Sequence, residues 1–383
     1  MSWPTVQLGD AYWFQEGPGI RNWQFTNSGI KLLNVGNIEK VGRINLAKTD
    51  RHISLDEAYG KYKHFLCDEG DLVIASSGIS IDDDGYLRTR GCFIEKQHLP
   101  LCINTSTIRF KSLSNNDLSY LKHWLQSVEF RKQITKLVTG SAQLNFGPSH
   151  LKQLRISLPP LTQQQRIAGI LDKAAEIKGK REHAVTKLDE LARSTFVEMF
   201  GDPVSNPKNL KMQKLTEFFR FKTGKLDSNA AVENGKYPFF TCSKESFLIN
   251  EYAFDEEALL LAGNNASGDY SVKHYAGKFN AYQRTYVINL ASSECTYEYA
   301  KTGLEFMLAK LKRLSKGTNT KYLTMGMFND MTILAPPKLL QEQYGEVIKN
   351  IEKLKAQEIV GLESLQKLTS SLQHQAFTTG FTS

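Results

Sequence analysis

The chain has 383 residues, more than one compact core of ordinary size needs, and this length suits two domains. Hydrophobic residues make up 41% and charged residues 23% of the sequence, so wholesale disorder and collagen-like composition are excluded. The formal net charge of +8 favours an anionic partner such as nucleic acid, although the same charge also serves solubility.

The sequence also indicates the compartment. No stretch approaches the roughly 20 apolar residues that a membrane helix requires, and the start lacks a basic region followed by an apolar run. The 5 cysteines are odd in number and contain no C-x-x-C pair, which argues against a disulfide framework and a zinc knuckle. We therefore expect a cytoplasmic protein with reduced thiols.

In chain order, the segment before each of two Pro-Pro pairs predicts a mixed α and β domain. Short apolar or alternating runs bounded by turn residues predict strands at 71–78 and 103–110, and again at 258–265 and 284–290. Helical spacing of apolar residues predicts one shorter helix in each half, at 119–137 and at 296–314. The expected domains are 1–158 and 202–335.

The two halves form an imperfect tandem repeat. Pro159-Pro160 recurs as Pro336-Pro337, an offset of 177 residues that holds through the following segment without a slip. Nearer the start of each half a weaker match at offset 207 pairs Leu8 with Leu215, so the first half holds about 30 additional residues. The halves therefore share one plan and differ inside it.

A long helix follows each Pro-Pro pair. In the segment 159–201, Thr162 and Gln165 form a capping box at the start, while Gly201 and Pro203 end the helix. Such a helix has about 38 residues and is roughly 57 Å long at about 1.5 Å per residue. The second helix occupies the segment 336–383, and its start is less well marked.

Apolar residues at alternating spacings of three and four predict that these helices form a coiled coil. The predicted seam consists of Ile167, Ile170, Ala174, Ile177, Arg181, Ala184, Leu188, Leu191 and Thr195 on the first helix, and Tyr344, Val347, Ile351, Leu354, Glu358, Gly361, Leu365, Leu368 and Leu372 on the second. The first helix enters the second domain and the second helix leaves it, so an antiparallel pair is expected. Arg181 then faces Glu358, unless both side chains extend into solvent. The fold class is α+β, a pseudo-two-fold tandem repeat.

Motifs for catalysis are missing from the sequence. There is no Gly-rich nucleotide loop or Walker motif, and Leu158 and Ala335 stand before the Pro-Pro pairs where N-methyltransferases place Asn or Asp. The acidic run 82–85 fits a solvated turn better than a metal site, and Cys67 near His64 has no recognisable orienting partner for a nucleophile. We predict no catalytic residues and no metal in this chain.

Cationic and polar side chains on loops are typical of proteins that bind bases and phosphates. The candidate DNA-binding residues are Lys61, Lys63, Ser76, Ser77, Arg88, Arg90, Gln143 and Asn145 in the first half, and Asn264, Asn265, Lys273, Gln283, Arg284, Lys316, Asn319, Lys321 and Tyr322 in the second. Any one of them alone fits a solvated surface position better than a DNA contact, so the prediction depends on the set.

These motifs resemble those of the specificity subunit of type I restriction-modification enzymes. The resemblance covers essentially the whole chain, and its most specific parts are ISLPPLTQQQRIAGILDKA, the transition ELARSTFVEMFGDP and the second copy ILAPPKLLQEQYGEVI. GDLVIASSG and FNAYQRTYVINL are similar to weaker motifs of the family's target-recognition domains. The second copy departs from the usual pattern at Ala335, Lys338 and Tyr344, which affects where its helix is expected to start.

The resemblance implies a function. The two domains would recognise the two parts of an asymmetric bipartite DNA target, and the helices would set the spacing. It further implies two methyltransferase subunits that carry S-adenosylmethionine, and motor-nuclease subunits that use ATP and magnesium; this chain itself would hold none of these cofactors. Leu171, Val185 and Phe196 are candidates for the methyltransferase contact, or for packing on the chain's own domains.

Two other functions stay open from the sequence. The chain could be a stand-alone enzyme that modifies or cleaves DNA, or a coiled-coil scaffold without DNA specificity. The half-site sequences, the spacer length and the loops that enter the groove do not follow from the residues, because one side chain can bind several base edges.

Overall fold

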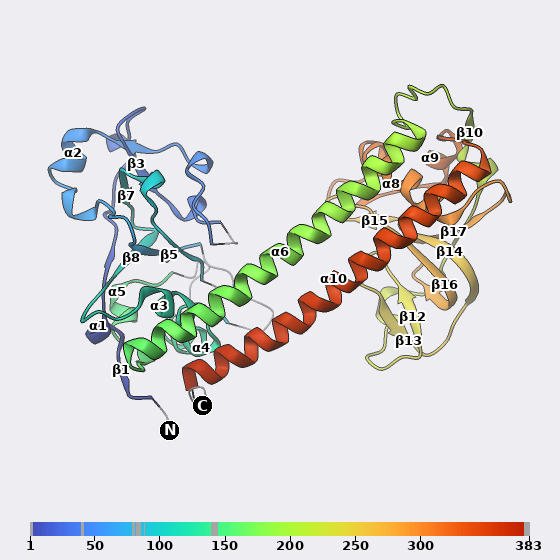
Figure 1. Cartoon of the computed structure of the whole chain (residues 1–383). Coiled ribbons are helices and arrows are strands. Elements are labelled where there is room, and N and C mark those ends of the chain that lie inside the picture. Colours follow the sequence, from blue (N-terminus) through green and yellow to red (C-terminus); the bar gives the residue numbers. More distant parts are fainter. Residues whose placement is uncertain are drawn as a thin grey trace. The chain divides into compact units, whose positions relative to one another are not determined.

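The computed structural model describes residues 3–39, 42–78, 81, 86–87, 89–138 and 145–378 (Figure 1). The chain divides into two compact units: unit 1 comprises Met1–Lys180 with Gly361–Ser383, and unit 2 comprises Arg181–Val360. The long helices α6 (Leu161–Phe200) and α10 (Lys338–Thr378) each contribute a segment to both units. Among the described residues, no helix combines the length and the hydrophobicity of a membrane span.

Unit 1 is built on a four-stranded sheet in the order β2-β8-β5-β6 and a three-stranded sheet in the order β4-β3-β7. Its strands are β1 (Thr5–Gln7), β2 (Tyr12–Glu16), β3 (Ile30–Leu33), β4 (His52–Ile53), β5 (Leu72–Ala75), β6 (Gly91–Phe93), β7 (Leu101–Ile103), β8 (Thr107–Ser112) and β9 (Arg155–Ser157). Its short helices are α1 (Leu8–Ala11), α2 (Leu55–Tyr59), α3 (Leu118–Trp124), α4 (Val128–Leu137) and α5 (Pro148–Leu151).

Unit 2 is built on a six-stranded sheet in the order β11-β17-β14-β16-β12-β13. Its strands are β10 (Met212–Lys214), β11 (Phe219–Thr223), β12 (Tyr237–Phe240), β13 (Phe247–Ile249), β14 (Phe254–Ala262), β15 (Asn264–Asn265), β16 (Val272–Ala281), β17 (Thr285–Leu290), β18 (Lys321–Tyr322) and β19 (Thr332–Leu334). Its helices are α7 (Leu215–Phe218), α8 (Tyr297–Leu314) and α9 (Met325–Asn329). Both units thus contain the mixed α and β structure expected from the sequence.

Equivalent strand pairs confirm the tandem repeat. In unit 1, β1 pairs antiparallel with β9 and places Thr5 opposite Ser157. In unit 2, β10 pairs antiparallel with β19 and places Met212 opposite Leu334. These partners correspond under the same two offsets, 207 and 177, that the sequence shows. Each unit therefore joins its first strand to the strand just before its Pro-Pro pair.

A buried glutamine connects the start of each long helix to an earlier helix of the same unit. In unit 1, the side chain of Gln164 accepts a hydrogen bond from the backbone N–H of Asp117 (2.8 Å) and donates one to the carbonyl of Pro159 (2.8 Å). Gln164 is only 1% exposed. Because Asp117 caps α3, this amide fixes α6 to α3.

Unit 2 repeats this arrangement at the equivalent position. Gln341 is completely buried, accepts from the backbone N–H of Thr296 (3.0 Å) and donates to the carbonyl of Pro336 (2.9 Å). Thr296 caps α8. The same side chain therefore fixes α10 to α8.

The starts and ends of the helices correct several sequence predictions. The carbonyl of Pro160 accepts the N–H groups of Gln163 (2.8 Å) and Gln164 (3.0 Å), so α6 starts at Leu161 and the capping box at Thr162 is wrong. The end was predicted correctly, since Gly201 follows α6 with a left-handed φ of 80°.

The two shorter helices had different outcomes. The helix expected at 119–137 is divided into α3 and α4, because the Ser127 side chain accepts from the N–H of Phe130 (3.3 Å) and caps a new helix. The helix expected at 296–314 forms as α8.

Within unit 2, the two long helices lie beside each other in opposite directions. Arg181 Nη1 is 2.8 Å from Glu358 Oε2, and the side chains of Asp189 and Lys355 also form an ion pair. The Arg181 and Glu358 side chains are 37% and 31% exposed, so their pair is half-buried and does not form a fully buried polar layer.

Part of the predicted seam is wrong by one residue. The following predicted seam residues are exposed: Ile177, Leu191, Val347, Leu354 and Leu368. At two positions the next residue packs instead: Ile348, after Val347, is 4% exposed, and Leu171, after the predicted Ile170, is 1% exposed. Leu171 and Phe196, offered as partner contacts, are core residues of units 1 and 2 respectively. Val185 is half-buried.

Replacing either buried glutamine with leucine should destabilise the protein. Gln341→Leu leaves the N–H of Thr296 and the carbonyl of Pro336 without this partner, at a cost of about 1–3 kcal/mol in the free energy of unfolding. Gln164→Leu should lower the free energy of unfolding by a similar amount through unit 1. The exposed neighbours Gln343 and Gln165 provide matched controls, and their replacement by leucine should change stability by less than about 0.5 kcal/mol in chemical denaturation.

Exchanging the charges of Arg181 and Glu358 tests their pairing. Arg181→Glu alone places two carboxylates together and should lower the free energy of unfolding by up to about 1 kcal/mol, since the pair is half-exposed. The double exchange Arg181→Glu with Glu358→Arg should restore it. A double variant as unstable as the sum of the single variants would contradict a direct interaction.

Candidate nucleic-acid interface

The candidate interface begins where an internal sheet strand of each unit ends. In unit 1, β5 is followed by Ser76, whose N–H donates to the carbonyl of Ser106 (3.0 Å) and whose carbonyl accepts from the N–H of Phe146 (3.0 Å). In unit 2, β14 is followed by Gly263, whose N–H donates to Arg284 (2.8 Å) and whose carbonyl accepts from Leu323 (2.8 Å). The two loops are therefore structurally equivalent.

The residues that follow these positions are polar and differ between the units. Ser77 comes next in unit 1 and Asn264 in unit 2, and both are partly exposed. Asn145 borders the loop of unit 1, where its Oδ1 accepts from the N–H of Gly78 (3.3 Å). The backbone framework is thus shared, while the side chains that it presents are specific to each unit.

In unit 2, strand pairing brings several predicted residues together. β15 pairs antiparallel with β18, which places Asn264 opposite Tyr322 and Asn265 opposite Lys321. The N–H of Lys316 donates to the carbonyl of Tyr322 (3.1 Å), so Lys316 lies in the same region. Five of the nine residues predicted in the second half therefore lie in one place.

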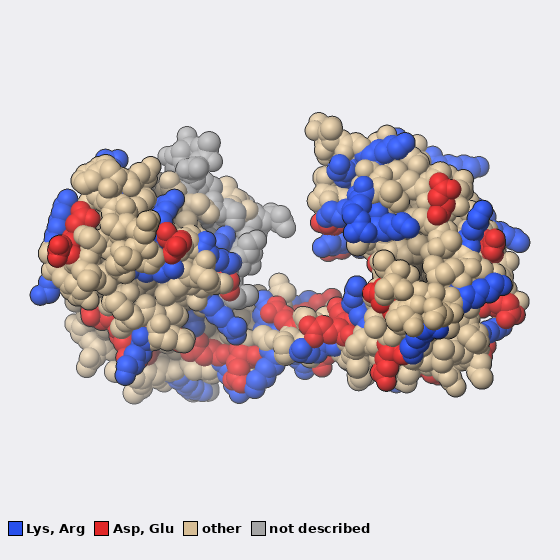
Figure 2. Space-filling view, turned by 90° about the horizontal axis from the view of Figure 1, so that it is seen from above, with Lys and Arg blue, Asp and Glu red and all other residues tan. Residues whose placement is uncertain are grey.

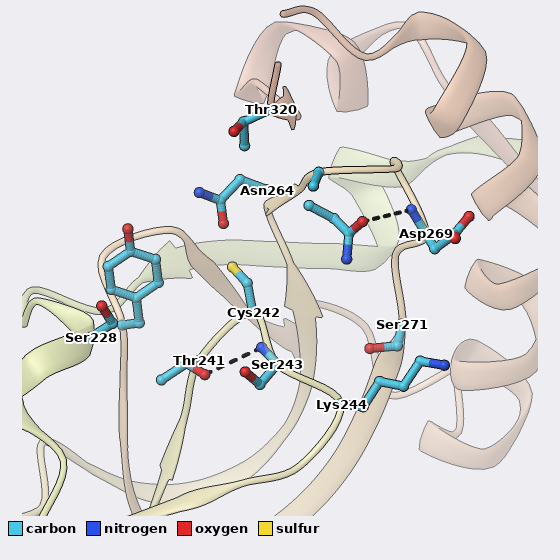
Figure 3. Close-up of a pocket in the computed structure, with 12 residues that line it drawn as sticks. Ser228, Thr241, Cys242, Ser243, Lys244, Asn264, Asp269, Ser271 and Thr320 are labelled. Atoms are coloured by element: carbon cyan, nitrogen blue, oxygen red, sulfur yellow. Dashed lines mark hydrogen bonds between the residues drawn. The ribbon is translucent and has the colours of Figure 1, made fainter. Parts of the chain in front are cut away.

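These segments border a hollow of about 440 Å³, shown in Figure 3. Its lining is almost entirely polar and comprises Ser228, Thr241, Cys242, Ser243, Lys244, Asn264, Asn265, Ala266, Asp269, Ser271, Tyr282 and Thr320. Most of these residues carry a group that can donate or accept a hydrogen bond, as expected for a surface that binds a polar ligand.

Two predicted residues have structural roles in this region. Lys273 Nζ donates to the carbonyls of Ser243 (2.8 Å) and Glu245 (3.2 Å), and burial lowers the pKa of its ammonium group. Asn265 Oδ1 accepts from the N–H of Ser267 (2.9 Å) and that of Asp269 (3.2 Å), which shapes the loop. Lys273 thus stabilises the backbone next to the hollow, and its ammonium group is less available to bind a phosphate.

The charge around the hollow is mainly positive. The segment 310–321 carries Lys310, Lys312, Arg313, Lys316 and Lys321 and no acidic residue. Lys312 pairs with Asp269 (2.5 Å) and lowers the pKa of that carboxyl group. Within the described residues, Lys316 and Lys321 form no ion pair, and Figure 2 shows Lys and Arg side chains crowded on one side of unit 2. This surface favours an anionic ligand.

The other predicted residues of unit 2 lie at loop tips. Gln283 and Arg284 are exposed on the tight turn between β16 and β17, where the N–H of Thr285 donates to the carbonyl of Tyr282 (2.8 Å). Asn319 is exposed in the loop before β18. These side chains are accessible to a ligand.

In unit 1 the described contacts do not bring the predicted DNA-binding residues together as they do in unit 2. Ser76 is 1% exposed, and Arg90 is half-buried just before β6. Lys61 lies over the ring of Tyr62, 5.1 Å from its centroid, and Lys63 is exposed nearby. None of the described contacts joins these lysines to the loop at Ser76. Arg88 and Gln143 lie outside the described residues, as does the acidic run 82–85.

The sequence interpretation left out most residues of the hollow, Thr241 and Cys242 among them, and it also left out Lys312, which pairs with the lining residue Asp269. Thr241 and Cys242 follow β12, a strand whose place in the sheet no local pattern indicates. Lys312 lies in the last turn of α8. The absence of acidic residues from 310–321 was a usable signal for Lys312, whereas the strand order of the sheet had no signal in the sequence.

The thiols and carboxylates do not form reactive clusters in the described residues. No group of three or more His, Cys, Asp or Glu side chains there could hold a metal ion. Cys67 is buried, and burial raises the pKa of its thiol, as it raises the pKa of Cys92, Cys102 and Cys295 to about 12. All 5 cysteines are free.

A protein-family model described as "Type I restriction modification DNA specificity domain" matches residues 3–187 and 207–364. Among curated proteins, the Escherichia coli type I restriction enzyme EcoDI specificity subunit is 38% identical over 156 residues, 39% of this chain and 34% of that protein. The Methanocaldococcus jannaschii MjaIX specificity subunit is 22% identical over 264 residues, 60% of this chain and 61% of that protein. The chain therefore covers less than two thirds of these relatives.

Solved structures show a similar fold. The S subunit of a type I restriction-modification system from M. genitalium superposes with a TM-score of 0.64 at 17% identity, covering 100% of this chain and 97% of that one. A chain from a study of complex assembly and conformational transition of the type I R-M system gives a TM-score of 0.51 at 15% identity, covering 98% and 97%.

Lys273 and Lys244 provide a matched test of the framework. Lys273→Met removes the donor to two backbone carbonyls and should lower the free energy of unfolding by about 1 kcal/mol, whereas Lys244→Met at the exposed rim should leave it within about 0.5 kcal/mol. Chemical denaturation measures both. Equal stability of the two variants would show that the Lys273 bridge contributes nothing to the fold.

Proposed function

The chain belongs to the family of type I restriction modification DNA specificity domains, and from that premise we propose that it is the DNA sequence-specificity subunit of a type I restriction-modification complex. It recognises an asymmetric bipartite target and directs adenine methylation and restriction by partner subunits. The observation that carries this proposal is the repeated loop after β5 and after β14, held by equivalent backbone bonds and presenting different polar side chains.

The difference between the two loops supports unlike half-sites. Ser77 offers a single hydroxyl group where Asn264 offers an amide, and Asn145 occupies the place of Tyr322. Side chains with different donor and acceptor patterns select different base edges in the major groove. Two different sequences on the DNA are therefore expected, one for each unit.

The long helices are the proposed spacer. We infer that α6 and α10 form an antiparallel coiled coil, which the ion pair of Arg181 and Glu358 supports within unit 2. The 40 residues of α6 correspond to roughly 60 Å at about 1.5 Å per residue. At about 3.4 Å per base pair this length matches some 17 or 18 base pairs.

The chain itself has no proposed catalytic role. The buried thiols have raised pKa values, so they are poor nucleophiles near neutral pH. S-adenosylmethionine, ATP and magnesium would bind to two methyltransferase subunits and to motor-nuclease subunits. Val347 and Leu354, exposed at heptad spacing on α10, replace Leu171 and Phe196 as candidates for a contact with a protein partner.

Methylation mapping tests the proposed function. The chain is expressed with its methyltransferase subunit in a host lacking other adenine methylation, and methylated adenines are mapped across the genome. The expected map is one asymmetric motif of two parts separated by unspecified bases. A short continuous motif, or no sequence preference with the partner present, would contradict the proposal and favour a scaffold; methylation or cleavage by the chain alone would favour an enzyme.

Changing the length of both helices tests the spacer. Inserting seven residues into α6 after 181 and seven into α10 before 358 keeps the heptad phase and adds about 10 Å. This length corresponds to about 3 additional base pairs. The methylation map should keep both half-sites and show the longer spacer, and an unchanged spacer would contradict the role of the helices.

A further inference from the structure

The hollow of unit 2 contains two side-chain amides with different tasks. Asn265 is engaged by its own loop, because its Oδ1 accepts from the N–H of Ser267 (2.9 Å), from the Ser267 hydroxyl group (2.9 Å) and from the N–H of Asp269 (3.2 Å). Asn264 is half-buried and makes no side-chain hydrogen bond to any described residue. Its donor and acceptor are both available to a ligand.

Other polar groups of the lining already form hydrogen bonds or can only donate them. Thr241 Oγ1 accepts from the N–H of Ser243 (3.2 Å), and the Cys242 thiol donates to the carbonyl of Arg284 (3.5 Å). Lys244 can only donate. Among the residues that line the hollow, Asn264 is therefore the one that presents a free donor and a free acceptor side by side on a single planar group.

The backbone at Asn264 is held firmly. It pairs with Tyr322 in the β15–β18 ladder, and the preceding residue, Gly263, is buried against the next strand. A Cβ atom on Gly263 would lie 2.3 Å from the carbonyl oxygen of Arg284, so no larger residue fits there. In Figure 3 the Asn264 side chain extends into the space between Thr320 and Cys242. Because the backbone is fixed, it does not have to become ordered before the Asn264 amide can bind a ligand.

We propose that Asn264 determines the specificity of unit 2 for an adenine–thymine base pair in its half-site. Adenine presents the N7 acceptor and the N6 donor at the major-groove edge, and an asparagine amide matches both at once. Guanine presents two acceptors at the same edge, so the amide oxygen would face another acceptor instead of a donor. The unpaired cations of 310–321 hold the phosphates nearby. This inference rests on the proposed function.

A phosphate contact is the competing role for Asn264. An amide N–H can donate to a phosphate oxygen, and such a contact carries no sequence information. The two roles differ in what a substitution does. Loss of a base contact changes the preferred base at one position, whereas loss of a phosphate contact weakens binding to every sequence alike.

The test uses the full chain with its methyltransferase subunit and a set of duplexes that carries each of the four base pairs at every position of the unit 2 half-site. Asn264→Ala and Asn264→Ser, the latter copying Ser77 of unit 1, should lower the preference for adenine–thymine at one position by about tenfold to a hundredfold. Asn264→Asp keeps the size of the side chain but loses its donor, and it should shift the preference there towards cytosine, whose N4 donates. The other half-site and the spacer should stay the same.

Lys321→Ala is the matched control, because Lys321 lies in the strand beside Asn265 and is expected to contact phosphate. It should weaken binding to all duplexes alike and reduce the dependence on salt. Unchanged base preference in all three Asn264 variants, or an equal loss for every duplex with thermal unfolding unaltered, would overturn the assignment. Failure of the wild-type complex to select any bipartite sequence would instead overturn the proposed function.

Discussion

The fold depends on one buried amide at the start of each long helix. Backbone groups beside a helix start have no partner within the helix, and the prolines before each long helix have carbonyls but no N–H of their own. Gln164 and Gln341 each bind a proline carbonyl and the N–H of the residue that caps a neighbouring helix at the same time. An amide is required because a carboxylate lacks the donor and an apolar side chain lacks both groups.

The two units share a framework of backbone hydrogen bonds and differ in the side chains that this framework presents. The strand pairs β1–β9 and β10–β19 and the bonds around Ser76 and Gly263 use backbone atoms, which any sequence possesses. The side chains at the strand ends are then free to differ without loss of the framework. Two surfaces of unlike chemistry can therefore exist within one repeated architecture, as the proposed asymmetric target would require.

The sequence predicted the repeat correctly and placed part of the helix seam wrongly, for a physical reason. Apolar residues occupy adjacent positions, such as Ile170 with Leu171 and Val347 with Ile348, so spacings of three and four fit two neighbouring stripes equally well. Packing against the domain cores selected the later residue of each pair. The candidate hollow was predicted only in part, because strand order, which brings Thr241 and Asn264 to the same hollow, depends on contacts distant in the sequence.

The two helices must be matched in length because each unit is completed by the end of a helix that starts in the other. Phe200, the last residue of α6, packs on Tyr299 in unit 2 at 4.9 Å between ring centroids. Phe377, near the end of α10, packs on Tyr120 in unit 1 at 5.3 Å. Lengthening one helix alone would remove its terminal phenylalanine from the buried site that receives it, at a cost of about 3–5 kcal/mol for a lost core aromatic side chain. Only equal changes in both helices keep both cores intact, and the proposed spacer role would then allow only changes in length that the two helices share.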